Sequence, residues 1–145
     1  MKDILNKLIN HNTLTKEVAK NTLLDISTGK KNNSQVSAFM TVYMMRNITV
    51  EELEGFRDAL LELCVAIDLS DFETVDLCGT GGDNKNTFNI STISAFVTAG
   101  AGIMVAKHGN YGVSSSCGSS NLLEHLGIKF SNNQSYLKKC VEKCG

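Results

Sequence analysis

The region between residues 74 and 120 alternates short apolar segments with glycine-rich polar loops, and this alternation constrains the fold most. It predicts strands over Thr74–Cys78 and Ile103–Ala106, separated by a helix over Ile90–Ala101. Each predicted strand runs directly into a glycine-containing cluster, GTGGD from position 79 and KHGN from position 107. A strand, helix, strand order favours a parallel sheet, in which both loops emerge at one edge. We therefore expect an α/β domain with a ligand site at the carboxyl ends of these strands.

Shorter elements are expected after the second loop. The pattern predicts a short helix over Leu122–Leu126, capped by Ser119 or Ser120, then a brief stretch over Ile128–Phe130 and a last amphipathic helix near Tyr136–Lys143. Two parallel strands alone make a marginal sheet. The sequence also ends where another strand is expected. Residues 71–145 are therefore predicted to be the incomplete beginning of a larger α/β domain with a parallel sheet.

Residues 1–70 have the pattern of successive amphipathic helices and predict a small all-helical domain. Thr15 is expected to cap the second helix and Ser34 the third. Thr49, followed three positions later by Glu52, matches a capping box at the start of the fourth. The apolar positions expected on the helix faces are Ile4, Leu5, Leu8, Ile9, Val18, Leu23, Ile26, Val36, Phe39, Met40, Tyr43, Met44, Leu53, Phe56, Leu60, Leu63 and Ile67.

Composition limits the classes of function. Fourteen Lys and Arg against fifteen Asp and Glu give a net charge of -1, so no broad basic field is available for nucleic acid. No apolar run approaches the roughly 20 residues that span a bilayer, and the polar N-terminus is not typical of a signal peptide. We expect a cytoplasmic protein. The five cysteines lack a CxxC pair, which predicts thiols rather than disulfides or a zinc site.

The polar residues around the two loops are typical of phosphate binding. Glycines let backbone N–H groups approach a ligand closely. Thr87, Asn89, Ser91 and Thr92 fall at the start of a predicted helix, where unpaired N–H groups and the helix dipole favour an anion. Helix capping alone would need only one of them. The spacing of GTGGD fits neither a P-loop nor a GxGxxG dinucleotide loop. The alternative to a phosphate-binding loop is a tight turn between strand and helix that binds no ligand.

The second loop adds further polar groups. Lys107 supplies a counter-charge for phosphate, and the Asn110 side chain can both donate and accept hydrogen bonds. Taken singly, Lys107 or His108 would more often be a solvated loop residue. The serine-rich run that follows extends the set of hydroxyls, although its composition alone would also suit a flexible linker.

Five motifs in this order, GTGGD, NTFNIST, VAKHGN, VSS and GSSNLLEHLG, resemble anthranilate phosphoribosyltransferase, an enzyme of tryptophan biosynthesis. The likeness includes MMRNITVEELEGFRDAL and covers essentially the whole chain. It implies a pentosyltransferase that transfers the 5-phosphoribosyl group from phosphoribosyl pyrophosphate to anthranilate, giving N-(5-phosphoribosyl)anthranilate and pyrophosphate, with Mg²⁺. It also implies a homodimer formed through the helical domain, and no catalytic nucleophile.

The resemblance also implies roles for individual residues. Gly79 and Asn110 would contact anthranilate, and Ser91 would bind Mg²⁺ in addition to the phosphoribosyl donor. The residues implied for phosphoribosyl pyrophosphate are Gly79, Gly82, Asp83, Thr87, Asn89, Ile90, Ser91, Thr92, Lys107, His108, Gly109, Asn110, Ser114, Ser115 and Ser119.

The sequence departs from the family pattern at two places. Most members have Arg after KHGN, whereas this chain has Tyr111 followed by Gly112, so a positive charge near the substrates is missing. The family's adjacent Asp-Glu pair for magnesium and a further Arg for anthranilate lie beyond Gly145. We therefore expect residues 1–145 alone to have little activity.

Two other readings of the same residues stay open. Pyrimidine nucleoside phosphorylases share the two-domain architecture and a glycine-rich phosphate loop, although KHGN and NIST match the amine-transferring family better. The third reading is a non-catalytic fragment that dimerises through its helices and binds only an anion at its glycine loops.

Overall fold

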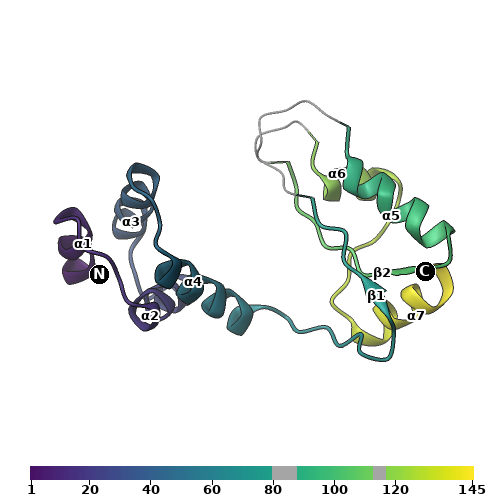
Figure 1. Ribbon diagram of the computed structural model, residues 1–145, viewed down its shortest axis with the longest axis horizontal. Coiled ribbons are helices and arrows are strands. Elements are labelled where there is room, and N and C mark those ends of the chain that lie inside the picture. The colour runs from purple at the N-terminus through teal and green to yellow at the C-terminus, as the bar shows by residue number, and fades with distance from the viewer. Residues whose placement is uncertain (80–87, 113–116) are drawn as a thin grey trace. The chain divides into compact units, whose positions relative to one another are not determined.

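The computed structural model describes residues 1–79, 88–112 and 117–145, and the chain divides into two compact units, Met1–Val65 and Ala66–Gly145 (Figure 1). The fourth helix ends at Leu63, so the helical unit ends a few residues before the predicted boundary at position 70 and before Ile67. Within the described ranges, we find no helix with the length and apolar character needed to cross a membrane.

The first unit is all-helical, as the sequence predicts. Thr15 caps the second helix by accepting a hydrogen bond from the N–H of Val18 at 3.4 Å. Thr49 and Glu52 form the predicted capping box at the start of the fourth. The helices are α1 (Lys2–Ile9), α2 (Lys16–Ser27), α3 (Asn33–Met45) and α4 (Val50–Leu63).

The predicted cap of α3 is wrong. Asn32 caps the helix, because its Oδ1 accepts a hydrogen bond from the N–H of Gln35 at 2.9 Å. Ser34 lies inside the first turn instead. Asn and Ser are both strong capping residues, and two of them within three positions leave the start of the helix undecided by sequence alone.

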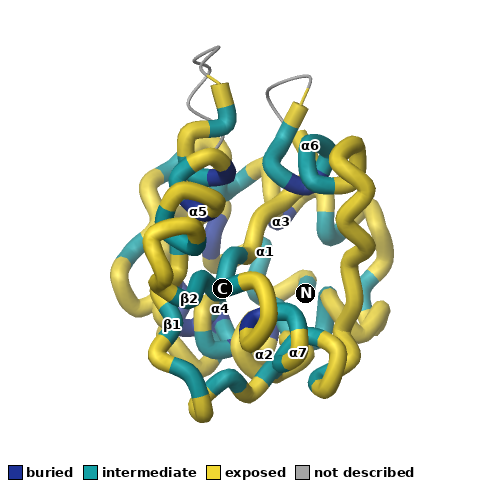
Figure 2. Tube along the Cα trace, turned by 90° about the vertical axis from the view of Figure 1, so that its right-hand side faces the viewer, coloured by how far each residue is buried: buried dark blue, intermediate teal, exposed yellow. Residues whose placement is uncertain are grey.

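A small apolar cluster holds the helical unit together. Leu8, Leu14, Ala19 and Phe39 are buried, and Figure 2 shows buried segments of the chain as short stretches between intermediate and exposed ones. The rings of Phe39, Tyr43 and Phe56 pack edge to face, with centroids between 4.9 and 6.0 Å apart. This geometry is favourable for aromatic side chains beyond the area that they bury.

α4 packs against α2 through small residues rather than through its large apolar ones. A Cβ atom on Gly55 would lie 2.2 Å from the carbonyl oxygen of Lys16, so the two helices approach too closely for any side chain there. Ala59 is also fully buried. In contrast, several large residues predicted to lie on apolar faces are exposed. They are Ile9, Met40, Met44, Leu53, Leu60 and Leu63.

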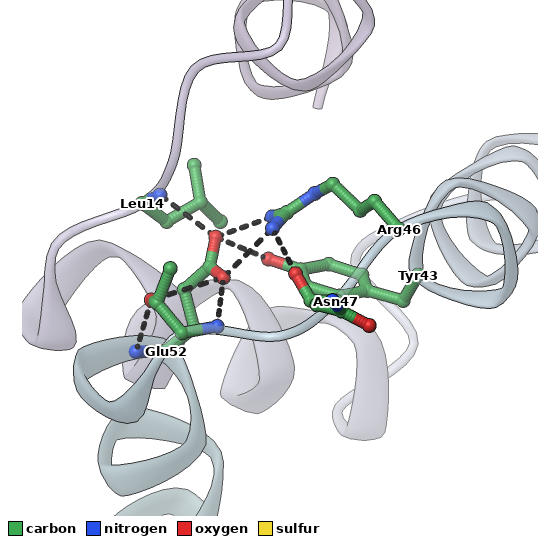
Figure 3. A network of polar contacts seen from close by, with 6 residues as sticks. Leu14, Tyr43, Arg46, Asn47 and Glu52 are labelled. Carbon is green, nitrogen blue, oxygen red and sulfur yellow. Dashed lines mark hydrogen bonds and ion pairs between the residues drawn. The ribbon is translucent and has the colours of Figure 1, made fainter.

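The buried carboxylate of Glu52 organises the polar part of the helical unit (Figure 3). It accepts hydrogen bonds from the N–H of Thr49 at 3.0 Å and from the hydroxyl of Tyr43 at 3.0 Å. It also pairs with the guanidinium of Arg46, which contacts both carboxylate oxygens. Burial disfavours the charged form, but these donors outweigh burial and lower the pKa of Glu52 to about 2.

The second unit has the predicted order of strand, helix and strand. Its elements are β1 (Thr74–Val75), α5 (Ile90–Gly100), β2 (Met104–Val105), α6 (Ser119–His125) and α7 (Gln134–Cys144). β1 and β2 are parallel, with Thr74 opposite Met104 and Val75 opposite Val105. Both strands are shorter than predicted, because β1 and β2 pair only at Thr74 with Met104 and at Val75 with Val105. The N–H of Ala106 adds a hydrogen bond to the Val75 carbonyl at 3.0 Å.

One local prediction in this unit is wrong. Ser119 and Ser120 do not cap α6 but lie inside its first turn, while Gly118 precedes it and donates its N–H to Oδ1 of Asn121 at 2.9 Å. The brief Ile128–Phe130 stretch lies between α6 and α7 and belongs to neither helix. α7 is held to the segment before β1, where the N–H of Asp68 donates to Gln134 Oε1 at 3.0 Å.

Candidate anion-binding site

The side chain of Lys107 joins the segments that follow the two strands. Its ammonium donates to the carbonyl oxygen of Leu77 at 2.8 Å and to the hydroxyl oxygen of Ser91 at 3.2 Å. Gly79 lies beside the same hydroxyl, because a Cβ atom at position 79 would be 2.8 Å from Ser91 Oγ. The structure therefore brings together Gly79 of GTGGD, Ser91 of NIST and Lys107 of KHGN.

The first turn of α5 offers fewer amides to an anion than the sequence predicts. Asn89 precedes the helix, but its side chain makes no capping bond to the described residues. The N–H of Ile90 already donates to the Phe88 carbonyl at 2.7 Å, and that of Thr92 donates to the Asn89 carbonyl at 3.1 Å. Ser91 thus contributes its hydroxyl, while these two backbone N–H groups are engaged within the chain.

Thr92 faces the interior. It is fully buried, and its hydroxyl oxygen has no hydrogen-bond partner among the residues that the structure describes. Leaving a buried hydroxyl unpaired is unfavourable. Because it is fully buried, the side chain of Thr92 lies away from the solvent side of the site.

The loop after β2 packs against the first turn of α6. A Cβ atom on Gly109 would be 2.1 Å from the hydroxyl oxygen of Ser119, so only glycine permits this approach. The carbonyl of Asn110 accepts from the N–H of Ser120 at 3.1 Å, and its side-chain carbonyl accepts from the N–H of Tyr111 at 2.8 Å. The side-chain carbonyl is therefore engaged, and the NH₂ group of Asn110 is the part that can donate to a ligand.

His108 has a partner that the sequence analysis did not single out. Its Nδ1 lies 3.2 Å from Oδ1 of Asp76, and both side chains are more than half exposed. Asp76 directly follows β1, as His108 closely follows β2. Asp76 lies inside the strand predicted over Thr74–Cys78, so no end-of-strand signal marked it, and it follows a strand only because β1 is shorter than predicted.

Tyr111, which directly follows the KHGN cluster, is oriented by α6. Its hydroxyl donates to Glu124 Oε1 at 2.7 Å. This hydrogen bond to a carboxylate raises the pKa of Tyr111. The ring also lines a shallow hollow with Ile128, Lys129 and Phe130.

Several predicted site residues lie outside the described ranges. They are Gly82, Asp83, Thr87, Ser114 and Ser115. The geometry above therefore rests on Gly79, on the start of α5, on residues 107–112 and on Ser119.

The family is decided by comparison with known proteins. Residues 71–145 match the model described as glycosyl transferase family, a/b domain, and residues 2–64 match that of the glycosyl transferase family, helical bundle domain. This chain belongs to the glycosyl transferase family. The helical domain and the following α/β unit are those that the sequence predicts.

Several glycosyl transferase relatives are similar over the whole chain. Anthranilate phosphoribosyltransferase of Flavobacterium johnsoniae is 68% identical over 145 residues, and that of Phocaeicola vulgatus is 54% identical; each match covers 100% of this chain and 44% of the relative. The crystal structure of the enzyme from Thermus thermophilus superposes with a TM-score of 0.81 at 29% identity, covering 96% of this chain and 42% of that one. The chain thus spans less than half the length of these relatives.

The described residues do not fit the Mg²⁺ ion that the resemblance to anthranilate phosphoribosyltransferase implies at Ser91. Mg²⁺ prefers oxygen ligands, several of them usually carboxylates, phosphates or water. The oxygen of Ser91 instead accepts a hydrogen bond from an ammonium at 3.2 Å. Within the described ranges, no group of three or more His, Cys, Asp or Glu side chains could hold a metal.

Proposed function

We propose that the whole protein transfers the 5-phosphoribosyl group from phosphoribosyl pyrophosphate to anthranilate. The relatives that match this chain throughout carry that name, and this chain has both the helical bundle domain and the a/b domain of the family. The observation that supports the proposal most is the juxtaposition of Lys107 and Ser91, beside Gly79, at the ends of two parallel strands. Such strand ends are where α/β proteins bind ligands.

These residues suit a reaction that needs positioning and charge stabilisation rather than a nucleophile. When the bond between the ribose and pyrophosphate breaks, negative charge grows on the departing pyrophosphate. Lys107 supplies a positive charge and Ser91 a hydroxyl donor for this charge. Asn110, in the loop after β2, has an NH₂ group that can donate to a substrate. Holding both substrates in register lowers the entropic part of the barrier. The Mg²⁺ requirement and cytoplasmic location stay predictions for the whole protein.

The test follows the loss of anthranilate fluorescence. A protein of the relatives' full length that carries this chain should consume anthranilate only when phosphoribosyl pyrophosphate is present. Gly79→Ala should lower kcat/KM by about tenfold or more, since the added Cβ would crowd Ser91 Oγ at 2.8 Å. Gly100→Ala is the matched control, because a Cβ there meets nothing within 4 Å. Phosphorolysis of thymidine without any use of the phosphoribosyl donor would contradict the proposal.

We also propose that the helical unit forms a homodimer. The groove between α3 and α4, about 660 Å³ in volume, is lined mainly by apolar side chains. Met40, Met44 and Leu60 in this groove are all more than half exposed. Exposed apolar patches rimmed by polar residues mark protein interfaces, and a second copy of the same surface would cover these side chains.

A further inference from the structure

The ammonium of Lys107 connects segments that are distant in the sequence. Lys107 follows β2, its first acceptor, Leu77, follows β1, and its second acceptor, Ser91, lies in the first turn of α5. An ammonium carries three N–H donors, and two of them are thus committed to oxygens of the chain itself. The side chain is partly buried, so water competes less for these charged hydrogen bonds than it would at the surface.

This arrangement conflicts with a metal ion on the same oxygen. Mg²⁺ binds oxygen at about 2.0–2.1 Å, which would place it at most about 5 Å from an ammonium that lies 3.2 Å from Ser91 Oγ. Two positive charges at that separation in a partly buried place repel strongly. One oxygen therefore does not serve Lys107 and a divalent cation at the same time in this geometry.

We propose that Lys107 is a positioning residue for Ser91: its ammonium, and not a metal ion, holds the Ser91 hydroxyl and ties it to the segment after β1. Because the oxygen accepts from Lys107, the hydroxyl proton points away from the ammonium and is available to an anion. The third N–H of Lys107 serves the same anion. The inference rests on the proposed function only for the identity of that anion.

The contact itself is tested without any ligand. Proton–nitrogen NMR spectra of lysine ammonium groups in the 145-residue chain should show Lys107 exchanging slowly with water in the absence of divalent cations. Ser91→Ala should speed this exchange by about threefold or more, because one acceptor is lost. Ser135→Ala, an exposed serine of α7, should leave the Lys107 signal unchanged.

Two results of that experiment would overturn the inference. One is a Lys107 signal that does not respond to Ser91→Ala. The other is selective broadening of the Ser91 amide by millimolar Mn²⁺ in the wild-type chain that disappears in Ser91→Ala, because a metal would then hold the hydroxyl.

Binding of inorganic pyrophosphate in the presence of a chelator separates positioning from simple charge. Lys107→Met should weaken binding about tenfold. Ser91→Ala should weaken it about threefold in the wild-type background but hardly at all in the Lys107→Met background, because the hydroxyl is then no longer oriented. Lys139→Met, on α7, controls for the loss of one positive charge. Independent, multiplying effects of the two substitutions would contradict the inference.

Failure of the proposed function would look different. If the wild-type chain binds no pyrophosphate at all, anion binding by this site is contradicted, while the lysine NMR experiment still decides whether Lys107 holds Ser91.

Discussion

The carboxylate of Glu52 accepts a hydrogen bond from the backbone N–H of Leu14 at 2.9 Å, across 38 positions of sequence (Figure 3). Leu14 belongs to the loop before α2, and Glu52 to the first turn of α4. The same side chain forms the capping box with Thr49 and pairs with Arg46. One buried charge therefore fixes the loop before α2, the end of α3 and the start of α4 relative to one another.

Glu52→Gln should destabilise the helical unit by about 3 kcal/mol. The substitution keeps the shape of the side chain but leaves Arg46 without its carboxylate, and breaking one member of a buried pair is costly. Urea unfolding followed by circular dichroism measures the loss. Glu51→Gln, at an exposed position in the same turn, should change stability by less than about 0.5 kcal/mol. A loss of less than about 1 kcal/mol for Glu52→Gln would show that the network contributes little.

Stability of the helical unit should depend on pH through Glu52. Its pKa is lowered from 4.5 to about 2 in the folded chain, so the folded state binds this proton less readily than the unfolded state. The contribution is complete above pH 4.5 and is lost as the pH falls toward about 2. The shift corresponds to about 3 kcal/mol. Urea midpoints between pH 6 and pH 2.5 should fall more steeply for the wild type than for Glu52→Gln; parallel curves would contradict this assignment.

Gly55→Ala should destabilise the contact between α2 and α4 by about 1–3 kcal/mol. The new methyl group would collide with the backbone oxygen of Lys16, which no side-chain rotation relieves. Gly100→Ala in α5 should be neutral or slightly stabilising, since its methyl group meets no atom within 4 Å. Amide hydrogen exchange reports on each unit separately. Unchanged protection in α2 and α4 of Gly55→Ala would mean that the helices can move apart at little cost.

Met44→Glu should dissociate the proposed homodimer. Met44 is 85% exposed and lines the apolar groove, so a carboxylate there would be buried unpaired at the interface. Met45 is 82% exposed and follows Met44 on α3 but does not line the groove, so Met45→Glu is the matched control. Sedimentation analysis should give half the wild-type mass for Met44→Glu only. A wild-type chain that is monomeric at all concentrations would rule out this interface for residues 1–145.

The sequence by itself determined the elements whose signals are local. The caps at Thr15 and Thr49 were predictable because a cap bonds to N–H groups two or three positions away. The strand, loop, helix order after position 74 was predictable because hydrophobic period and glycine content change there. The cap of α3 was not, since Asn32 and Ser34 are equivalent candidates and only the hydrogen bond to Gln35 chooses between them.

The tertiary structure alone decided which side chains meet. Hydrophobicity marks Met44 and Leu60 as core residues, yet α4 buries Gly55 and Ala59, because the closest approach of two helices requires small side chains rather than large ones. The hydrogen-bond partners of Lys107 are likewise decided by the tertiary structure. Nothing local in KHGN specifies a bond to Leu77 or Ser91, because those contacts exist only once parallel strands bring their ends together.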